Sequence, residues 1–404
     1  MAVNISKRII RLGLLSSFIL LSVVFLSTHS KVNEFIFGSS VASDAVAKGI
    51  TEGGEKPSIV DKNASKDLGD YAEHFAGDME STGDSEGKPK ACFVSLVRNE
   101  ALWDIVPSIQ QVEDRFNRNY KYPWVFLNDV PFTDEFKHVV SNIVSGSVEF
   151  GIIPKEHWSY PNWIDQEKAA KARQEMAENN IIYGGSEPYR HMCRFESGFF
   201  WRHPLLKKFN WYWRVEPSTQ LYCDIKYDVF KWMQEHKKVY GFTISIREYE
   251  ATIKTLWETT KQFMKEYPNY IEKDNMMAFI SDDNGKTYNL CHFWSNFEIA
   301  SLDFWRSDRY KTYFEYLDKA GGFFYERWGD APVHSIAAAL MLRKDQIHYF
   351  ADIGYHHPPY SNCPADNKLW SEGRCSCNQK NDFTFEGYSC GTKFYEVNGM
   401  KRPT

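Results

Sequence analysis

Apolar positions along the chain fall into short runs that alternate with longer amphipathic segments. Apolar runs that end in polar residues predict strands at residues 90–97, 122–127, 148–153, 209–216, 239–246 and 346–351. Amphipathic or alanine-rich segments predict helices at residues 165–179, 189–202, 224–236, 249–266, 302–319 and 331–342. Because strands and helices alternate, the pattern predicts an α/β fold with a largely parallel sheet flanked by helices.

One of these apolar runs ends in an acid followed by a proline. Aromatic and β-branched residues at 209–215 predict a buried strand, and Pro217 ends it because proline has no N–H to give the ladder. Glu216 is therefore expected at the carboxyl end of a strand, where open α/β sheets bind ligands. With Asp224 close behind, it is a candidate ligand for Mg²⁺ or Mn²⁺, which prefer oxygen donors. The structural alternative is an ion pair with Arg214 or a helix cap.

The N-terminal residues predict a membrane anchor with a lumenal domain behind it. Basic residues at 7, 8 and 11 precede an uncharged apolar run at 12–26. We expect a cytoplasmic tail at 1–11, a transmembrane signal-anchor at 12–28, a disordered lumenal stem at 29–89 and one large domain at 90–404. The stem contains the glycosylation acceptor Asn63. A cleaved signal peptide is the alternative to the anchor.

Charge and cysteine usage narrow the class of protein. The formal net charge of −5 over 404 residues gives no reason to expect nucleic-acid binding. Cys363, Cys375, Cys377 and Cys390 crowd a tail without helical or strand periodicity. In an oxidising lumen we expect disulfides here rather than a zinc site, because the spacing has no C-x-x-C pair, and we expect Cys375 and Cys377 to pair elsewhere. The other four cysteines are buried thiols or further bridges.

Six sequence blocks, in order along the domain, carry a family resemblance. They are FVSLVRNE at 93–100, YRHMCRF at 189–195, WRVEP at 213–217, CHFWSNFEI at 291–299, WGDAPVHS at 328–335 and GYHHPP at 354–359. In these blocks the chain resembles the fungal Golgi α-1,2-mannosyltransferases, type II membrane enzymes that extend O-linked and N-linked mannans. The blocks span nearly all of residues 91–364, which makes the match more specific than any single motif.

The resemblance implies a fold, a reaction and a compartment. The fold would be that of the GT-A nucleotide-sugar glycosyltransferases. The donor would be GDP-mannose, the cofactor Mn²⁺, and the acceptor a mannose hydroxyl of an O-linked or N-linked glycan. The new α-1,2 linkage would keep the anomeric configuration of the donor, and the enzyme would work in the Golgi lumen as a single-pass type II membrane protein.

The resemblance also assigns roles to particular residues. Glu216 matches the family's metal-ligating acid, and His357 matches a second metal ligand, with its neighbour His356 as the alternative. Glu298 matches an acid that faces the anomeric carbon, where a retaining transfer needs a nucleophile or a stabilising charge. Its structural alternative is an acid at a helix start. Tyr189 matches a tyrosine near the reaction centre, and its alternative is ordinary core packing.

Four further residues are candidates for donor binding. Arg98, at the end of the first strand, is placed to contact the nucleotide, and Arg190 and Arg194 are suited to binding its phosphates, although arginines on helices are more often solvated or paired. Asp330 is a candidate for binding sugar hydroxyls, or else it caps the helix that starts near residue 331.

Two other classes of function fit the same residues. A hydrolase would use Glu216 and Glu298 as a carboxylate pair and would need no nucleotide. An inactive relative would bind mannan through aromatic side chains without turnover. Thermal melting with GDP and Mn²⁺ separates them, because only a transferase should be stabilised by the two ligands together.

Overall fold

The computed structural model describes residues 87–403. The predictions for the tail, the anchor, nearly all of the stem and the acceptor Asn63 therefore lie outside the described residues. Within 87–403, no helix combines the length and the apolar composition that a membrane crossing requires.

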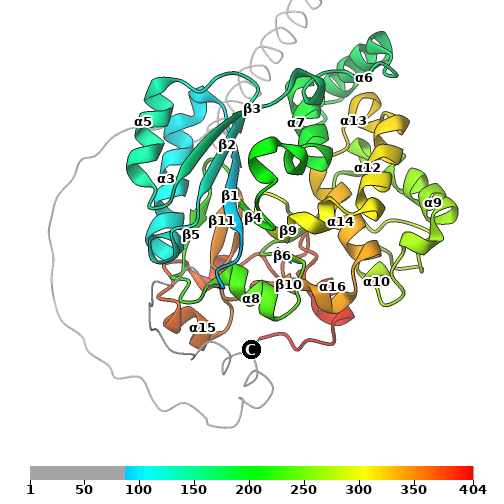
Figure 1. The fold of residues 1–404 in the computed structure, drawn as a ribbon. Helices are drawn as coiled ribbons and strands as arrows, with labels where there is room; N and C mark the ends of the chain where they lie inside the picture. Colours follow the sequence, from blue (N-terminus) through cyan, green and yellow to red (C-terminus); the bar gives the residue numbers. More distant parts are fainter. Residues whose placement is uncertain (1–86, 404) are drawn as a thin grey trace, which may run out of the picture. The chain divides into compact units, whose positions relative to one another are not determined.

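A seven-stranded sheet forms the centre of this region, in the order β10-β6-β9-β4-β1-β2-β3 (Figure 1). Its strands are β1 (Ala91–Leu96), β2 (Trp124–Asn128), β3 (Val148–Ile152), β4 (Trp211–Arg214), β6 (Tyr240–Phe242), β9 (Glu298–Ser301) and β10 (Ile347–Tyr349). All neighbours are parallel except β9, which runs antiparallel to both β4 and β6. The prediction of a mixed, largely parallel sheet is confirmed.

Smaller antiparallel sheets extend from this centre. One contains β5 (Gln220–Leu221), β11 (Tyr355–His357) and β12 (Tyr360–Asn362), and the other contains β7 (Ser245–Arg247) and β8 (Cys291–Phe293). The strand predicted at 239–246 is thus divided between β6 and β7, which belong to different sheets. Strand β11 brings its two histidines beside the chain that follows β4.

Helices cover the sheet on both sides. They are α3 (Leu102–Val112), α4 (Arg118–Tyr120), α5 (Asp134–Ile143), α6 (Gln166–Glu178), α7 (Glu187–Gly198), α8 (Val229–Glu235), α9 (Leu256–Glu266), α10 (Met277–Ile280), α11 (Leu302–Trp305), α12 (Asp308–Ala320), α13 (Gly322–Tyr325), α14 (Asp330–Met341), α15 (Asn367–Glu372) and α16 (Gly391–Val397). Helices α3 and α5 lie on one side, and α7, α12 and α14 on the other (Figure 1).

Alternation along the central strands divides the apolar residues between two cores. In β1, Phe93 belongs to the core on the side of α3, where its ring lies 4.5 Å from that of Trp124. The next residue, Val94, belongs to the core on the side of α7 and α14, together with Tyr212 of β4. Because side chains alternate along a strand, the central strands contribute to both cores, and the sheet lies between them.

Local capping explains where several helices differ from the predicted ranges. The Ser186 hydroxyl accepts the N–H of Tyr189 at 3.2 Å, so α7 begins two residues earlier than predicted. Asp228 caps α8, which leaves Asp224 outside the helix that was predicted to include it. The cysteine-rich tail, whose sequence has no helical or strand periodicity, nevertheless contains the short helix α15.

Two of the three disulfides in residues 87–403 join the tail to the body of the domain, and the third lies within the tail. They are Cys223–Cys375, Cys291–Cys390 and Cys363–Cys377, whereas Cys92 and Cys193 are buried thiols. The preference for disulfides over zinc is confirmed, and Cys375 and Cys377 each pair elsewhere, as expected.

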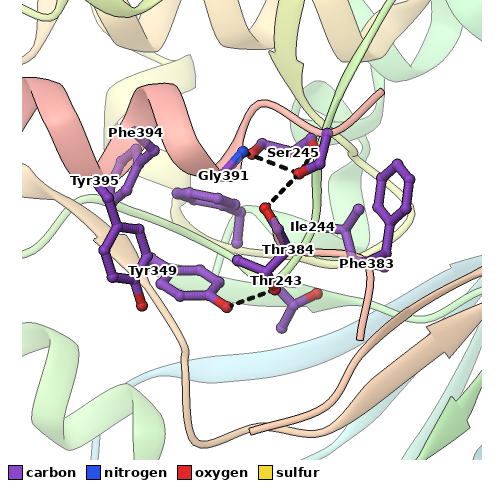
Figure 2. A pocket seen from close by; sticks show the side chains of 11 residues that line it. Thr243, Ile244, Ser245, Tyr349, Phe383, Thr384, Gly391, Phe394 and Tyr395 are labelled. Carbon is purple, nitrogen blue, oxygen red and sulfur yellow. Dashed lines mark hydrogen bonds between the residues drawn. The ribbon is translucent and has the colours of Figure 1, made fainter. Parts of the chain in front are cut away.

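The segment around Cys390 also packs against β7 through hydrogen bonds. It closes a small cavity lined by Thr243, Tyr349, Thr384 and Phe394 (Figure 2). The N–H of Cys390 donates to the carbonyl of Ser245 at 3.1 Å, and the Tyr349 hydroxyl lies 3.1 Å from that of Thr384. Together with the disulfide to Cys291, these contacts hold residues 384–390 against β7, β8 and β10.

The length of chain that each bridge closes predicts its contribution to stability. Replacing both Cys291 and Cys390 by Ala opens a bridge between positions 99 residues apart, whereas the pair Cys363 and Cys377 are 14 apart. Loop-closure entropy predicts losses of about 4.7 and about 3 kcal/mol for loops of roughly 100 and 15 residues. Urea unfolding of the two double variants should therefore rank Cys291/Cys390 as the more damaging loss. The reverse order would contradict this account.

Candidate functional site

A cleft of about 370 Å³ opens at the carboxyl ends of β1, β2 and β4. Arg98 and Asp129 enter it from the chain that follows β1 and β2, and Glu216 from the chain that follows β4. Helix α7 forms the opposite wall with Tyr189 and Glu196. Glu216 is thus at the end of its strand, as predicted, and the cleft lies at the edge where α/β sheets bind ligands.

Arg214, the last residue of β4, binds two acids at the base of the cleft. Its guanidinium hydrogen-bonds Glu216 on one side and Asp330 on the other, where the N–O distance is 2.6 Å. Asp330 also accepts the hydroxyl of Ser295 at 2.7 Å. Although burial alone raises the pKa of Asp330, the charge of Arg214 and its hydrogen bond lower that pKa below its ordinary value. Asp330 is therefore held as a carboxylate that faces a fixed cation.

The second histidine of β11 faces the free oxygen of Glu216. The Nε2 atom of His357 lies 3.8 Å from Oε2 of Glu216, and Trp294 packs edge-on to the imidazole at 4.7 Å between ring centroids. His356 points to the other face of the strand, where its Nδ1 lies 2.9 Å from the hydroxyl of Ser361. Of the two histidines, only His357 shares a face with Glu216.

This donor set suits a divalent cation that is bound together with a diphosphate. Glu216, from the chain that follows β4, offers a carboxylate oxygen, and His357, the last residue of β11, offers an imidazole nitrogen. Among residues 87–403, no group of three or more acidic, histidine or cysteine side chains forms a complete metal cage. Mg²⁺-like cations often take one or two protein ligands and complete their shell with phosphate oxygens and water. Asp224 takes no part, because it pairs with Arg115 at 2.9 Å.

The structure places Glu298 in the core rather than in the cleft. It is the first residue of β9, it is completely buried, and it is not among the residues that line the cleft. Its carboxylate accepts hydrogen bonds from the hydroxyls of Tyr212 and Tyr240, the latter at 2.7 Å. The Nδ1 atom of His334 lies 3.0 Å from its second oxygen. Glu298 is therefore neither a helix-start acid nor a group that faces open space, and its predicted catalytic role finds no support in this position.

His334 carries a positive charge in this network. Its Nε2 atom lies 3.1 Å from the main-chain carbonyl oxygen of Glu196, which can only accept, while Nδ1 faces the carboxylate of Glu298. Both ring nitrogens must then carry hydrogen. Burial alone lowers the pKa of His334, but the charge of Glu298 outweighs it and raises the pKa above its ordinary value. A buried ion pair thus joins β9, α14 and α7.

The remaining predicted residues divide into two groups. Arg98 and Tyr189 line the cleft, and Tyr189 stacks on Tyr183 at 4.4 Å between ring centroids. Arg190 and Arg194 do not reach it. Arg190 donates to the main-chain carbonyls of residues 186 and 326, and Arg194 makes a bidentate ion pair with Asp318 at 2.7 and 2.8 Å. Instead of binding phosphates, both arginines fasten α7 to the elements behind it.

Sequence reasoning missed Glu196 as a cleft residue. It lies seven residues after Tyr189 on α7, which is two helical turns and therefore the same face. The side chain is almost fully buried, and burial raises the pKa of Glu196 to about 7, with Arg214 acting in the opposite direction. The spacing between Tyr189 and Glu196 was the available signal, but helix periodicity alone does not tell which face meets a cleft.

The chain is similar in sequence to known proteins. A family described as glycolipid 2-alpha-mannosyltransferase matches residues 54–399. The glycolipid 2-alpha-mannosyltransferase of Saccharomyces cerevisiae is 52% identical, over 100% of this chain and 98% of the relative.

Two solved structures of similar proteins share the fold of the described region. Core-mannan synthase A from Aspergillus fumigatus, in its Mn/GDP form, has a TM-score of 0.74 and 40% identity over 80% of this chain and 88% of that one. The mannosyltransferase Ktr4p from S. cerevisiae, in complex with GDP, has a TM-score of 0.74 and 43% identity over 80% of this chain and 85% of that one. The expected GT-A-like glycosyltransferase fold is confirmed.

Because Glu298 is buried and fully hydrogen-bonded, we expect its replacement to lower the free energy of unfolding. In Glu298→Gln, the amide offers one acceptor oxygen to three donors and leaves the buried charge of His334 unpaired. Breaking a buried pair in this way costs about 3–5 kcal/mol. Urea unfolding should show this loss, whereas Glu235→Gln, at an exposed position on α8, should change the free energy of unfolding by less than about 0.5 kcal/mol.

The decrease in unfolding free energy that Glu298→Gln causes should also depend on pH. Because the pKa of His334 is raised in the folded protein, the stabilisation from its proton is complete below the unfolded value of about 6.5 and is lost as the pH rises through the folded value. The difference in unfolding free energy between wild type and Glu298→Gln should therefore be larger at about pH 5.5 than at about pH 9. A difference that is constant with pH would mean that His334 is neutral.

Proposed function

Because this chain belongs to the glycolipid 2-alpha-mannosyltransferase family, we propose that it transfers mannose from GDP-mannose to a mannose hydroxyl of an O-linked or N-linked glycan. The linkage formed is α-1,2, and the anomeric configuration of the donor is retained. The observation that carries this proposal is the pair of Glu216 and His357 at the mouth of the cleft, in a fold shared with a relative whose structure is an Mn/GDP form.

The cleft divides into a nucleotide side and a sugar side. Arg98 and Asp129, at the ends of parallel strands, are placed for the nucleotide. Glu216 and His357 hold Mn²⁺, which neutralises the charge of the leaving diphosphate. Arg214 fixes the carboxylate of Glu216 in place, so that one oxygen remains for the cation. The α7 wall, with Tyr189 and its neighbours, is left for the sugars.

The aromatic pair on the sugar side suits a mannose-terminated acceptor. Tyr183 is 56% exposed, lines the cleft and stacks on Tyr189 with an angle of 11° between the rings. A flat, partly exposed aromatic face with hydroxyl groups can pack against the apolar face of a sugar ring and hydrogen-bond its hydroxyls. Asp330 is buried and does not line the cleft, so we assign it the role of holding Arg214 rather than a sugar hydroxyl.

The two other classes of function fit the geometry less well. A hydrolase that used Glu216 and Glu298 would need both carboxylates at the substrate, but Glu298 is completely buried and accepts hydrogen bonds from protein groups. A sugar-binding protein without turnover would not need a carboxylate and a histidine converging beside the cleft.

The compartment is part of the same proposal. The basic residues at 7, 8 and 11 and the apolar run at 12–26 support a type II anchor, and three disulfides support an oxidising lumen. We place the enzyme in the Golgi membrane with its domain in the lumen, because the family resemblance points to glycan extension there.

The two histidines of β11 provide a matched test of metal binding. His357→Gln should abolish the stabilisation that GDP and Mn²⁺ give together in thermal melting, and should abolish mannose transfer to methyl α-mannoside. His356→Gln, which changes the neighbouring ring on the opposite face, should retain both. Loss of stabilisation in the His356 variant, with His357→Gln unaffected, would reverse the assignment, and release of mannose from a mannoside without nucleotide would favour a hydrolase.

The domain boundary can be tested by two deletions that differ by only a few residues. Removal of residues 1–86 should leave a soluble protein that binds GDP and Mn²⁺ and transfers mannose. The main-chain carbonyl of Lys90 accepts the N–H groups of Asn210 and Trp211 at 2.7 and 3.1 Å, and β1 pairs on both sides. Removal of residues 1–93 deletes half of this central strand and should give insoluble protein. An inactive or insoluble shorter deletion would place part of the stem in the domain.

A further inference from the structure

One carboxylate that lines the cleft, that of Glu196, has no role in the proposed binding of the nucleotide and the metal. We propose that Glu196 is a catalytic residue whose carboxylate lies against the transferred sugar and stabilises the positive charge that develops at its anomeric carbon. This inference rests on the proposed transferase function. It concerns the sugar side of the cleft, opposite the face that holds Glu216 and His357.

Glu196 differs from Glu216, Asp330 and Glu298 in having no hydrogen-bond donor. Its side chain is 4% exposed and lines the cleft, yet among the described residues no group donates a hydrogen bond to its carboxylate or forms an ion pair with it. Glu216 and Asp330, in contrast, both bind Arg214, and Glu298 has three donors. Burying an acid without a hydrogen-bond partner is costly even with the charge of Arg214 nearby, so an acid in this position at a cleft wall is a candidate for contact with a ligand.

The contacts around Glu196 fix the main chain of α7 and do not involve the Glu196 carboxylate itself. The main-chain carbonyl of Glu196 accepts from Nε2 of His334 at 3.1 Å, and the carbonyl of the next residue, Ser197, accepts the hydroxyl of Tyr310 at 2.6 Å. Two residues earlier, on the opposite side of the helix, Arg194 ties α7 to Asp318. Helix α7 is therefore fastened on its rear face, and the face that carries Glu196 cannot turn away from the cleft. Such preorganisation is what electrostatic stabilisation of a transition state requires.

The transfer step balances with Glu196 as a charge that is not consumed. The bond between the anomeric carbon and the diphosphate oxygen breaks, and its electron pair stays on the diphosphate. The acceptor hydroxyl oxygen bonds to the same carbon, and its proton passes to a diphosphate oxygen. Between these events the sugar carbon is positive, and a carboxylate that the fold already holds beside it stabilises this charge without reorganisation. Glu196 forms no bond and returns unchanged.

The test compares isosteric variants on one helix. Glu196→Gln should lower kcat for transfer from GDP-mannose about 10²–10³-fold, the loss expected when one preorganised group is removed. The KM for GDP-mannose and the thermal stabilisation by GDP and Mn²⁺ should stay close to wild type. The control Glu187→Gln, the same change at the first residue of α7, which pairs with Arg173 and is not among the residues that line the cleft, should keep kcat within about threefold. In Glu196→Ala, added formate should restore part of the lost turnover.

Each contrary result has a distinct meaning. A kcat for Glu196→Gln within threefold of wild type overturns the proposal, as does a loss of turnover matched by loss of the stabilisation by GDP and Mn²⁺. Capture of a mannosylated Glu196 by mass spectrometry with a slow fluorinated donor overturns the non-covalent role. These results leave the transferase function standing when wild type is active. Absence of transfer by wild type refutes that function itself, which the Glu196 variants do not test.

Discussion

The ion pairs of Arg214 are the constraint on which the site depends. Arg214 ends β4, where its main chain pairs with Val94 of β1 and with Glu298 of β9. Its buried guanidinium binds Glu216 on the cleft side and Asp330 at the start of α14. A buried cation is tolerated only when it is paired, so these contacts are obligatory for the fold as well as useful to the site. They fix the end of the central strand, the proposed metal ligand and the first turn of α14 as one unit.

The charges around Arg214 explain why the cleft favours a cation. Burial lowers the pKa of Arg214, but the nearby charges of Glu196, Glu216 and Asp330 raise it well above its ordinary value. One guanidinium thus faces three acids, and the cleft has an excess of negative charge. The pair of Glu298 and His334 neutralises itself and does not remove this excess. A divalent cation balances it, and the same cation then allows a diphosphate to approach acids that would otherwise repel it.

Strands and their ends could be predicted from the sequence because the signal is local. Pro217 marked the end of β4, and that placed Glu216 at the correct edge of the sheet without knowledge of any distant residue. Contacts between distant residues could not be predicted. Arg194 carries the same local signal whether it binds a phosphate or Asp318, which lies 124 positions away. Strand β9 was missed because it is four residues long and follows a loop, too short for periodicity to separate it from a helix start.

The same limit explains why sequence reasoning singled out Glu298 and missed Glu196. Glu298 stands between aromatic residues in the sequence, which suits a sugar site. In the fold, however, its carboxylate accepts hydrogen bonds from the hydroxyls of Tyr212 and Tyr240, which lie on neighbouring strands. Glu196 stands in an ordinary amphipathic helix and acquires its place only because Arg194 and His334 fix which face of α7 meets the cleft. An acid with three donors gives up most of its capacity to stabilise new charge, whereas an acid without donors keeps it. The carboxylate that is best satisfied by the protein is therefore the one least able to act on a substrate.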